Sequence, residues 1–193
     1  MRKILFNDKF GLTQAVLDGT KTMTRRFIPI DETRGGLIPI SYWEGKWCSA
    51  HGRFLKRQPY KIGEILAIAQ PYKDLGITFA PYADPTFKAK HVPKWGNPRR
   101  MAGWNNKLFV RADLMPHQIR ITDVWAEGLH DIKDEDCLKE GIVKRDGMYG
   151  FYGNDKLYKT PKEAFQNLII KMSGKKVWED EPWVFAYTFE LIK

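Results

Sequence analysis

The stretch Gly19-Thr20-Lys21-Thr22-Met23-Thr24-Arg25-Arg26 joins a glycine to β-branched and basic side chains. It follows residues 8–18, whose apolar residues can share one buried side of a helix. A glycine after the last helical residue suits a left-handed C-cap, and threonines favour extended backbone. We therefore expect a helix over 8–18, weakened by Gly11, then a cap at Gly19. Residues 20–28 then predict a turn that leads into a strand, which ends before the next proline.

Further elements can be recognised by hydrophobic periodicity along the rest of the chain. The pattern predicts strands over 3–6, 63–69, 108–114, 118–127 and 183–191, and helices over 133–140 and 161–172. Residues 118–127 alternate apolar and polar side chains, with a slip near Val124. The 161–172 helix has Thr160 as its N-cap and Pro161 as its first residue.

Two irregular segments, residues 31–61 and 70–106, interrupt this order. The first contains Glu44-Gly45-Lys46 between aromatic residues, which is typical of a hairpin turn. The second is rich in proline, aromatic residues and lysine, and its aromatics favour an ordered excursion over disorder. Because no βαβ repetition, internal repeat or linker is present, we expect a single domain over 1–193. Its fold class is α+β: a small mixed β-barrel with about three helices packed on it and two long inserts.

The chain has 193 residues, with 32 basic and 23 acidic side chains that give a formal charge of +9. Excess positive charge attracts polyanions at long range, although many basic proteins bind no nucleic acid. No apolar run reaches the ~18 residues that a membrane helix needs, and the apolar stretch near the N-terminus is too short for a signal peptide. We expect a soluble, cytoplasmic protein without a membrane partner.

Cysteine and histidine spacing gives no sign of a metal site. Cys48 and Cys137 are far apart, and two reduced thiols are favoured over a disulfide. The four histidines are scattered, and neither a phosphate-binding glycine loop nor a nucleophile elbow is present. We therefore expect no metal and no cofactor.

The Gly19–Arg26 stretch, a GxKTxTxR-type motif after the first helix, resembles the ASCH domains of the PUA-like superfamily. Four further segments fit the resemblance: Gly63–Leu66, Ile119–Thr122 continued by Asp134–Gly141, the helix over 161–172, and the ending from Trp178 to Glu190. The matching segments span nearly the whole chain except the two inserts, and the closest similarity is to phage- and prophage-borne ASCH proteins. The resemblance implies a PUA-like β-barrel.

The same resemblance implies two activities. One is RNA binding, sometimes with RNA cleavage. The other is hydrolysis of the amide of N4-acetylcytidine by small bacterial ASCH amidohydrolases, which use a lysine, a threonine and a glutamate. These match Lys21, Thr24 and Glu140 here, with Glu135 as the rival of Glu140. Because fold does not fix activity, the residues leave open whether the chain is an enzyme.

The first functional hypothesis is a domain that binds RNA, a nucleotide or a modified nucleoside in a basic cleft. The alternative is an amidohydrolase that cleaves N4-acylated cytosine nucleosides, with a ribonuclease as a weaker enzymatic option. A third hypothesis is a phage-encoded effector that binds a host protein, but the sequence gives no specific sign of one.

The hydrolytic alternative assigns each residue a chemical role. Thr24 would be the nucleophile, and Lys21 would be its base if burial lowers the lysine pKa. Arg26 would hold the developing oxyanion. Residues 21 and 24 point to opposite faces of a regular strand, so they converge only if the chain bends after Gly19. The competing interpretation is that Lys21, Arg25 and Arg26 form a solvated basic strand.

The binding hypothesis draws on Lys21, Arg25 and Arg26 together with the second insert. There, basic side chains alternate with aromatic rings, a composition that suits phosphate contacts with base stacking. The predicted contacts of the insert are Trp95, Arg99, Arg100 and Trp104. Packing of these aromatics on the barrel is the equal alternative, whereas Trp178 and Trp183 flank the last strand and are expected in the core.

Overall fold

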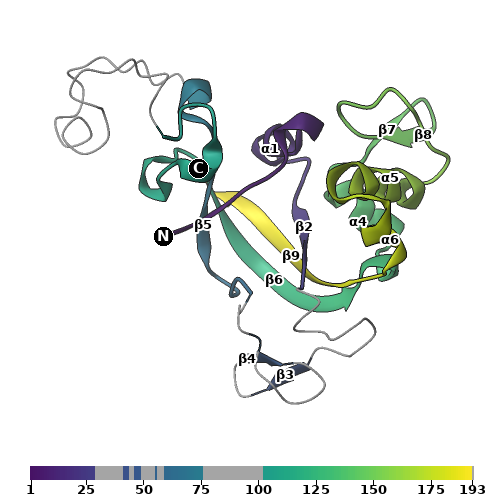
Figure 1. Cartoon of the computed structure of the whole chain (residues 1–193), viewed down its shortest axis with the longest axis horizontal. Helices are drawn as coiled ribbons and strands as arrows, with labels where there is room; N and C mark the ends of the chain where they lie inside the picture. Colours follow the sequence, from purple (N-terminus) through teal and green to yellow (C-terminus); the bar gives the residue numbers. More distant parts are fainter. Residues whose placement is uncertain (29–40, 44–45, 49–54, 56–58, 76–101, 193) are drawn as a thin grey trace.

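The structure is a computed structural model that describes residues 1–28, 41–43, 46–48, 55, 59–75 and 102–192 (Figure 1). Its main sheet has five strands in the order β1-β5-β6-β9-β2. Their bounds are β1 Arg2–Ile4, β5 Ile65–Ile68, β6 Gln118–Gly128, β9 Trp183–Ile192 and β2 Met23–Phe27. Strands β1 and β5 pair in parallel, and all other neighbours are antiparallel. The fold is thus a mixed α+β architecture, as expected.

The sheet curls because its two longest strands bend together (Figure 1). The pairing of β6 with β9 shifts register between Ile121 and Asp123, close to the slip expected near Val124. A bulge of this kind bends the strand and increases its twist. Among the described residues the two edge strands do not pair with each other, so no closed barrel is formed there. A side chain joins the two edges instead, since Arg26 donates from Nη2 to the Leu5 carbonyl oxygen, 2.6 Å away.

Two short hairpins lie outside the main sheet. Strands β3 (Ser41–Trp43) and β4 (Lys46–Cys48) pair antiparallel around the turn predicted at residues 44–46. Strands β7 (Val143–Arg145) and β8 (Met148–Gly150) form the second hairpin. Its turn residues Asp146 and Gly147 both have positive φ, as a two-residue type I′ turn requires.

The first helical segment differs from its prediction. Instead of one helix over 8–18, a 3₁₀ turn η1 (Asp8–Phe10) precedes helix α1 (Leu12–Leu17). Gly11 separates them with a left-handed φ of 62°, which breaks the regular hydrogen-bond ladder. Gly19 also has a positive φ, as expected of a cap.

The prediction of a strand over residues 108–114 is wrong. Two 3₁₀ turns occupy it, η4 (Lys107–Phe109) and η5 (Ala112–Leu114). The Lys3 ammonium accounts for the difference, because it donates to the carbonyl oxygens of Leu108 and Val110, each 2.6 Å away. These carbonyls are therefore held by a side chain and not by a strand partner. Two further 3₁₀ turns are η2 (Tyr72–Leu75) and η6 (Leu129–Asp131).

Two of the later helices, α4 (Asp134–Lys139) and α5 (Pro161–Ser173), lie where the sequence predicts them, whereas the sequence does not predict α6 (Lys175–Glu179). The three helices cluster together (Figure 1), and α5 begins with the predicted cap, since the Thr160 hydroxyl accepts from the backbone N–H of Glu163. None of the helices in the described ranges has the length and apolar character that a membrane span requires.

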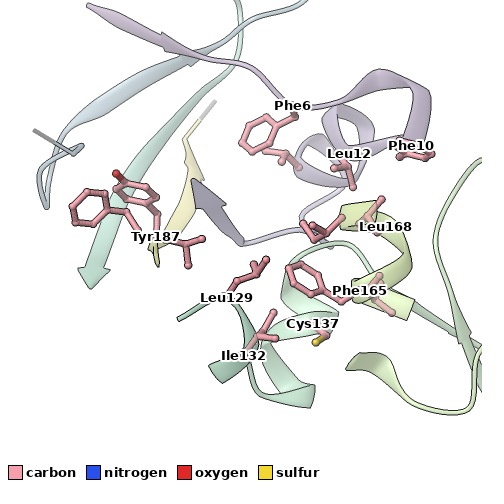
Figure 2. Packing of buried hydrophobic residues seen from close by; sticks show 14 of the residues in the cluster. Phe6, Phe10, Leu12, Leu129, Ile132, Cys137, Phe165, Leu168 and Tyr187 are labelled. Carbon is pink, nitrogen blue, oxygen red and sulfur yellow. The ribbon is translucent and has the colours of Figure 1, made fainter. Parts of the chain in front are cut away.

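The core lies between the sheet and these helices (Figure 2). Helix α5 contributes a buried stripe of Ala164, Phe165, Leu168 and Ile169, with Met172 partly buried beside it. Trp178 is buried and Trp183 packs on the same core while partly exposed. Both cysteines are buried, and they are not joined to each other in a disulfide. The core therefore fixes α4 and α5 against the start of β2.

A test of this arrangement is the Gly141→Ala variant. Gly141 follows α4 with a φ of 102°, and a Cβ there would lie 3.0 Å from Leu12 Cδ2. Strained backbone costs roughly 1–3 kcal/mol, and overpacking adds about 1 kcal/mol or more. In urea unfolding, Gly141→Ala should lose more stability than the matched Gly147→Ala, which has φ 77° but open space around it. Equal losses would show that Gly141 does not pack as described.

Candidate functional site

A pocket of about 420 Å³ opens where β2 meets α1, α5 and the segment after β1. Its apolar walls include Phe6, Leu12, Leu129 and Phe165. Its polar lining consists of Lys21, Thr24, Arg25, Arg26, Lys107 and Glu140. All three residues predicted as catalytic, Lys21, Thr24 and Glu140, therefore line one pocket.

The backbone before β2 makes the bend that this convergence needs. The N–H groups of Thr20 and Lys21 both donate to the carbonyl oxygen of Ala15 at 2.9 Å, so the chain wraps around the end of α1. The next N–H, of Thr22, donates to the carbonyl oxygen of Lys139 in α4, 3.0 Å away. Strand β2 begins only at Met23. Because Lys21 precedes the strand, the alternation of side chains along a strand does not decide where Lys21 points.

The Lys21 side chain is almost fully buried and bound to one residue. The residue is 2% exposed, and its Nζ donates to Glu140 Oε2 at 2.5 Å and to the Glu140 carbonyl oxygen at 2.8 Å. Glu140 caps the C-terminus of α4 and is 5% exposed. Its rival Glu135 lies exposed on the same helix. The geometry thus selects Glu140 as the partner of Lys21.

Burial also changes the protonation of Lys21. Desolvation lowers the pKa of the Lys21 ammonium below the ordinary 10.5, although the Glu140 carboxylate opposes this shift. The positive charges of Arg26 and Arg25 lower the pKa further. A buried amine in this setting carries its lone pair at a lower pH than a surface lysine, which is what a general base requires.

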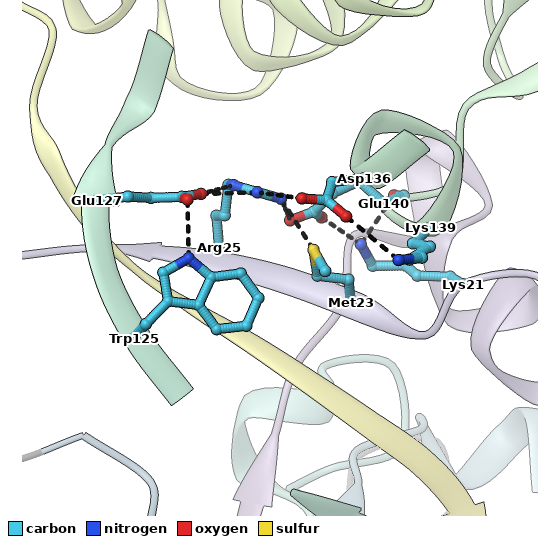
Figure 3. Close-up of polar contacts among 8 residues, drawn as sticks. All are labelled: Lys21, Met23, Arg25, Trp125, Glu127, Asp136, Lys139 and Glu140. Carbon is cyan, nitrogen blue, oxygen red and sulfur yellow. Dashed lines mark hydrogen bonds and ion pairs between the residues drawn. The ribbon is translucent and has the colours of Figure 1, made fainter. Parts of the chain in front are cut away.

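Arg25 lies in a network of three carboxylates (Figure 3). Its side chain is only 2% exposed. Its Nε donates to Glu127 Oε1 at 2.7 Å, its Nη1 donates to Glu140 Oε1 at 3.2 Å, and Asp136 forms an ion pair at 3.5 Å. Glu127 is held from its other side, because Trp125 Nε1 donates to its Oε2 at 2.7 Å. The solvated-strand interpretation is therefore wrong for Arg25, as it is for Lys21.

Thr24 and Arg26 share the other face of β2. They are two residues apart, and alternation places both on the side of their β9 partners Tyr187 and Phe185. Thr24 is buried, and within the described residues no hydrogen bond joins it to Lys21. The Nε of Arg26 is buried and has no hydrogen-bond partner in the described part of the chain. The pocket thus contains a hydroxyl and a spare cationic donor.

The residues predicted in the second insert fall in two groups. Trp95, Arg99 and Arg100 lie outside the described residues. Trp104 is partly buried and packs against a small second core that includes Tyr72 and Val110. Of the two alternatives for Trp104, the structure therefore shows packing on the domain.

Sequence reasoning missed the partners of Arg25. Glu127 lies on β6, two strands away from Arg25, and Ala186 of β9 lies between Arg25 and Trp125 in the register. The small Ala186 side chain leaves room for the guanidinium to cross β9. Only the strand order β6-β9-β2 brings these groups together, and no motif in the sequence signals it.

Comparisons with known proteins add no assignment. No family model matches the chain, and no match was found among curated proteins or among solved structures. Within the described ranges, no group of three or more His, Cys, Asp or Glu side chains is arranged to hold a metal ion. Function is therefore inferred from the pocket itself.

The burial of Lys21 predicts a specific pH dependence of stability. Between its lowered folded pKa and 10.5 the unfolded chain binds more protons, so wild-type stability rises with pH in this window. Lys21→Met has no such group. The melting temperature of Lys21→Met relative to wild type should therefore fall by roughly 3–5 °C per pH unit toward pH 10.

The matched control is Lys175→Met, since the Lys175 side chain is 77% exposed. Its melting temperature relative to wild type should stay flat over the same range. A flat curve for Lys21→Met as well would contradict a lowered pKa of Lys21.

Proposed function

We propose that the chain is a PUA-like ASCH domain that hydrolyses the N4-acyl amide of a modified cytosine nucleoside. The observation that carries the proposal is that Lys21 is buried with its Nζ 2.5 Å from Glu140 Oε2, in a pocket that Thr24 also lines. A binding module has no need of a desolvated lysine, whereas a hydrolase with a threonine nucleophile needs a base.

The PUA-like barrel is part of the proposal. It is supported by the curled five-stranded sheet and by the link from Arg26 to the Leu5 carbonyl oxygen, which brings the two sheet edges together. The order of elements along the chain also fits the resemblance noted in the sequence.

The first chemical step forms an acyl-enzyme. The neutral Lys21 amine takes the proton of the Thr24 hydroxyl as Oγ1 attacks the acyl carbonyl carbon, and the carbonyl π electrons move to its oxygen. Collapse of the tetrahedral intermediate breaks the bond from carbon to N4. The Lys21 ammonium gives its proton to the departing N4, so cytidine leaves and the acyl group stays on Thr24.

The second step restores the enzyme. Lys21, neutral again, takes a proton from a water molecule that attacks the Thr24 ester. The ester bond breaks, the Lys21 ammonium returns the proton to Oγ1, and a carboxylic acid is released, which ionises in solution. Glu140 keeps the amine in place through both transfers, since its carboxylate and its carbonyl oxygen each accept from Nζ.

The remaining pocket residues suit the charge and size of this substrate. The Nε of Arg26, which has no hydrogen-bond partner among the residues that the structure describes, supplies a donor for the oxyanion of each tetrahedral intermediate. A volume of about 420 Å³ falls within the ~300–1,000 Å³ of small-ligand sites. Apolar walls that include Phe6 and Phe165 offer surfaces for a base. These dimensions suit a nucleoside better than a duplex.

The binding hypothesis, an RNA or nucleotide ligand in a basic cleft, is the second candidate. The charge of +9 and the presence of Arg26 and Lys107 at the pocket favour it. Binding of single-stranded RNA that weakens steeply with salt, without turnover of any acylated cytosine, would favour this candidate over hydrolysis.

Activity on N4-acetylcytidine tests the hydrolase. Wild-type protein should release acetate, Lys21→Ala should lose about 10²–10⁴-fold in rate, and Thr24→Ala should fall to background. Thr24→Ser keeps a hydroxyl and should retain measurable activity. Thr22→Ala is the matched control, because Thr22 does not line the pocket, and its rate should match wild type. Inactivity of folded wild-type protein across a panel of N4-acylcytosines would refute the proposal.

A further inference from the structure

We propose that Arg25 is a positioning residue that acts through Glu140 to keep Lys21 ready as a base. The inference rests on the proposed function for its effect on rate. Its structural basis is a single carboxylate shared by two buried cations, with Oε2 bound to Lys21 at 2.5 Å and Oε1 bound to Arg25 at 3.2 Å.

The shared carboxylate lies at the edge of the sheet. Strand β2 is an edge strand, and Glu140 stands at the end of α4 beside it. Alternation places Arg25 on the face of β2 opposite Thr24 and Arg26. Glu140 therefore lies between Lys21 and the Arg25 guanidinium, and all three residues line the same pocket.

Arg25 changes what the Glu140 carboxylate does to Lys21. In an isolated buried pair, the carboxylate would stabilise the lysine ammonium and keep its proton in place. A guanidinium is charged at every accessible pH, so Arg25 competes permanently for the same carboxylate. Its positive charge also opposes a second positive charge on Lys21 directly. Arg25 therefore favours the neutral amine.

The other charges around this pair set how strongly Arg25 competes. Glu127 binds Arg25 from β6, and Asp136 of α4 contacts Arg25 while also pairing with Lys139. Arg26 and Lys107 add positive charge at the pocket. Trp125 fixes Glu127, and through it the guanidinium. Removing the charge of Glu127 would free Arg25 to favour Glu140 more strongly.

The structure thus predicts opposite effects for two neighbouring substitutions. Arg25→Met removes the competitor, so Lys21 should hold its proton to higher pH. Glu127→Gln strengthens the competitor and removes a nearby negative charge, so Lys21 should lose its proton at lower pH. Arg25→Lys keeps the charge but loses the planar fork, and it should shift the Lys21 titration less than Arg25→Met does.

Titration of Lys21 by NMR tests these signs without any substrate. Protein with ¹³C-labelled lysine Cε is titrated, and the Lys21 signal is assigned by its loss in Lys21→Met. The midpoint should rise by about one pH unit or more in Arg25→Met and fall in Glu127→Gln. The acidic limb of the rate–pH profile should move in the same direction as the midpoint. Below the midpoint, the rate should fall about tenfold for each pH unit.

The outcomes separate this inference from the proposed function. If the midpoint stays unchanged in both Arg25→Met and Glu127→Gln, the role of Arg25 is refuted, whether or not the protein hydrolyses acylcytosines. If the midpoints move as expected but wild type is inactive, the proposed reaction fails while the coupling stands. Should Arg25→Met fail to fold, the Glu127→Gln titration alone decides, because a rise or no change there contradicts the coupling.

Discussion

The contact between Lys21 Nζ and Glu140 is the constraint on which the rest of the site depends. An ammonium removed from water loses several kcal/mol of solvation, and a single carboxylate seldom restores all of it. Two glycines with positive φ nevertheless bring the two residues together. Gly19 redirects the backbone into Lys21, and Gly141 follows Glu140 at the C-cap of α4. Such a group is expected where its reactivity serves function more than stability.

The site divides along β2 into a reactive face and a supporting face. Thr24 and Arg26 lie on one side, where the pocket holds a hydroxyl and a spare donor. Arg25 alternates to the opposite face of the strand, where it pairs with three carboxylates, although it also contributes to the pocket lining. Glu140 is the only one of these groups bound to Lys21 in the described part of the chain, so it couples both faces to the base. Under the proposed reaction, this short strand would carry the nucleophile, the oxyanion donor and the arginine that supports the base.

Much of this arrangement could be predicted from local sequence patterns, and the rest could not for physical reasons. Helix α5 and strands β6 and β9 form where hydrophobic periodicity predicts them: α5 buries one apolar stripe, β6 buries alternate residues at its start, and β9 is buried on both faces from Val184 to Tyr187. The strand expected over 108–114 failed because Lys3, a residue distant in sequence, holds its carbonyls. The lysine and threonine of the site came from the motif, whereas the ties from Arg25 to Glu127 and Asp136 depend on strand order and helix placement.

The central claim is that this pocket places an acylated cytosine against Thr24. The most direct test is a crystal structure of the Lys21→Met variant with N4-acetylcytidine, since the slowed reaction should leave the substrate intact. The account predicts the acyl carbon about 3–3.5 Å from Thr24 Oγ1, with the acyl oxygen toward Arg26. A ligand bound elsewhere, such as beside Tyr42 and Trp47, with this pocket empty at saturating concentration, would contradict it.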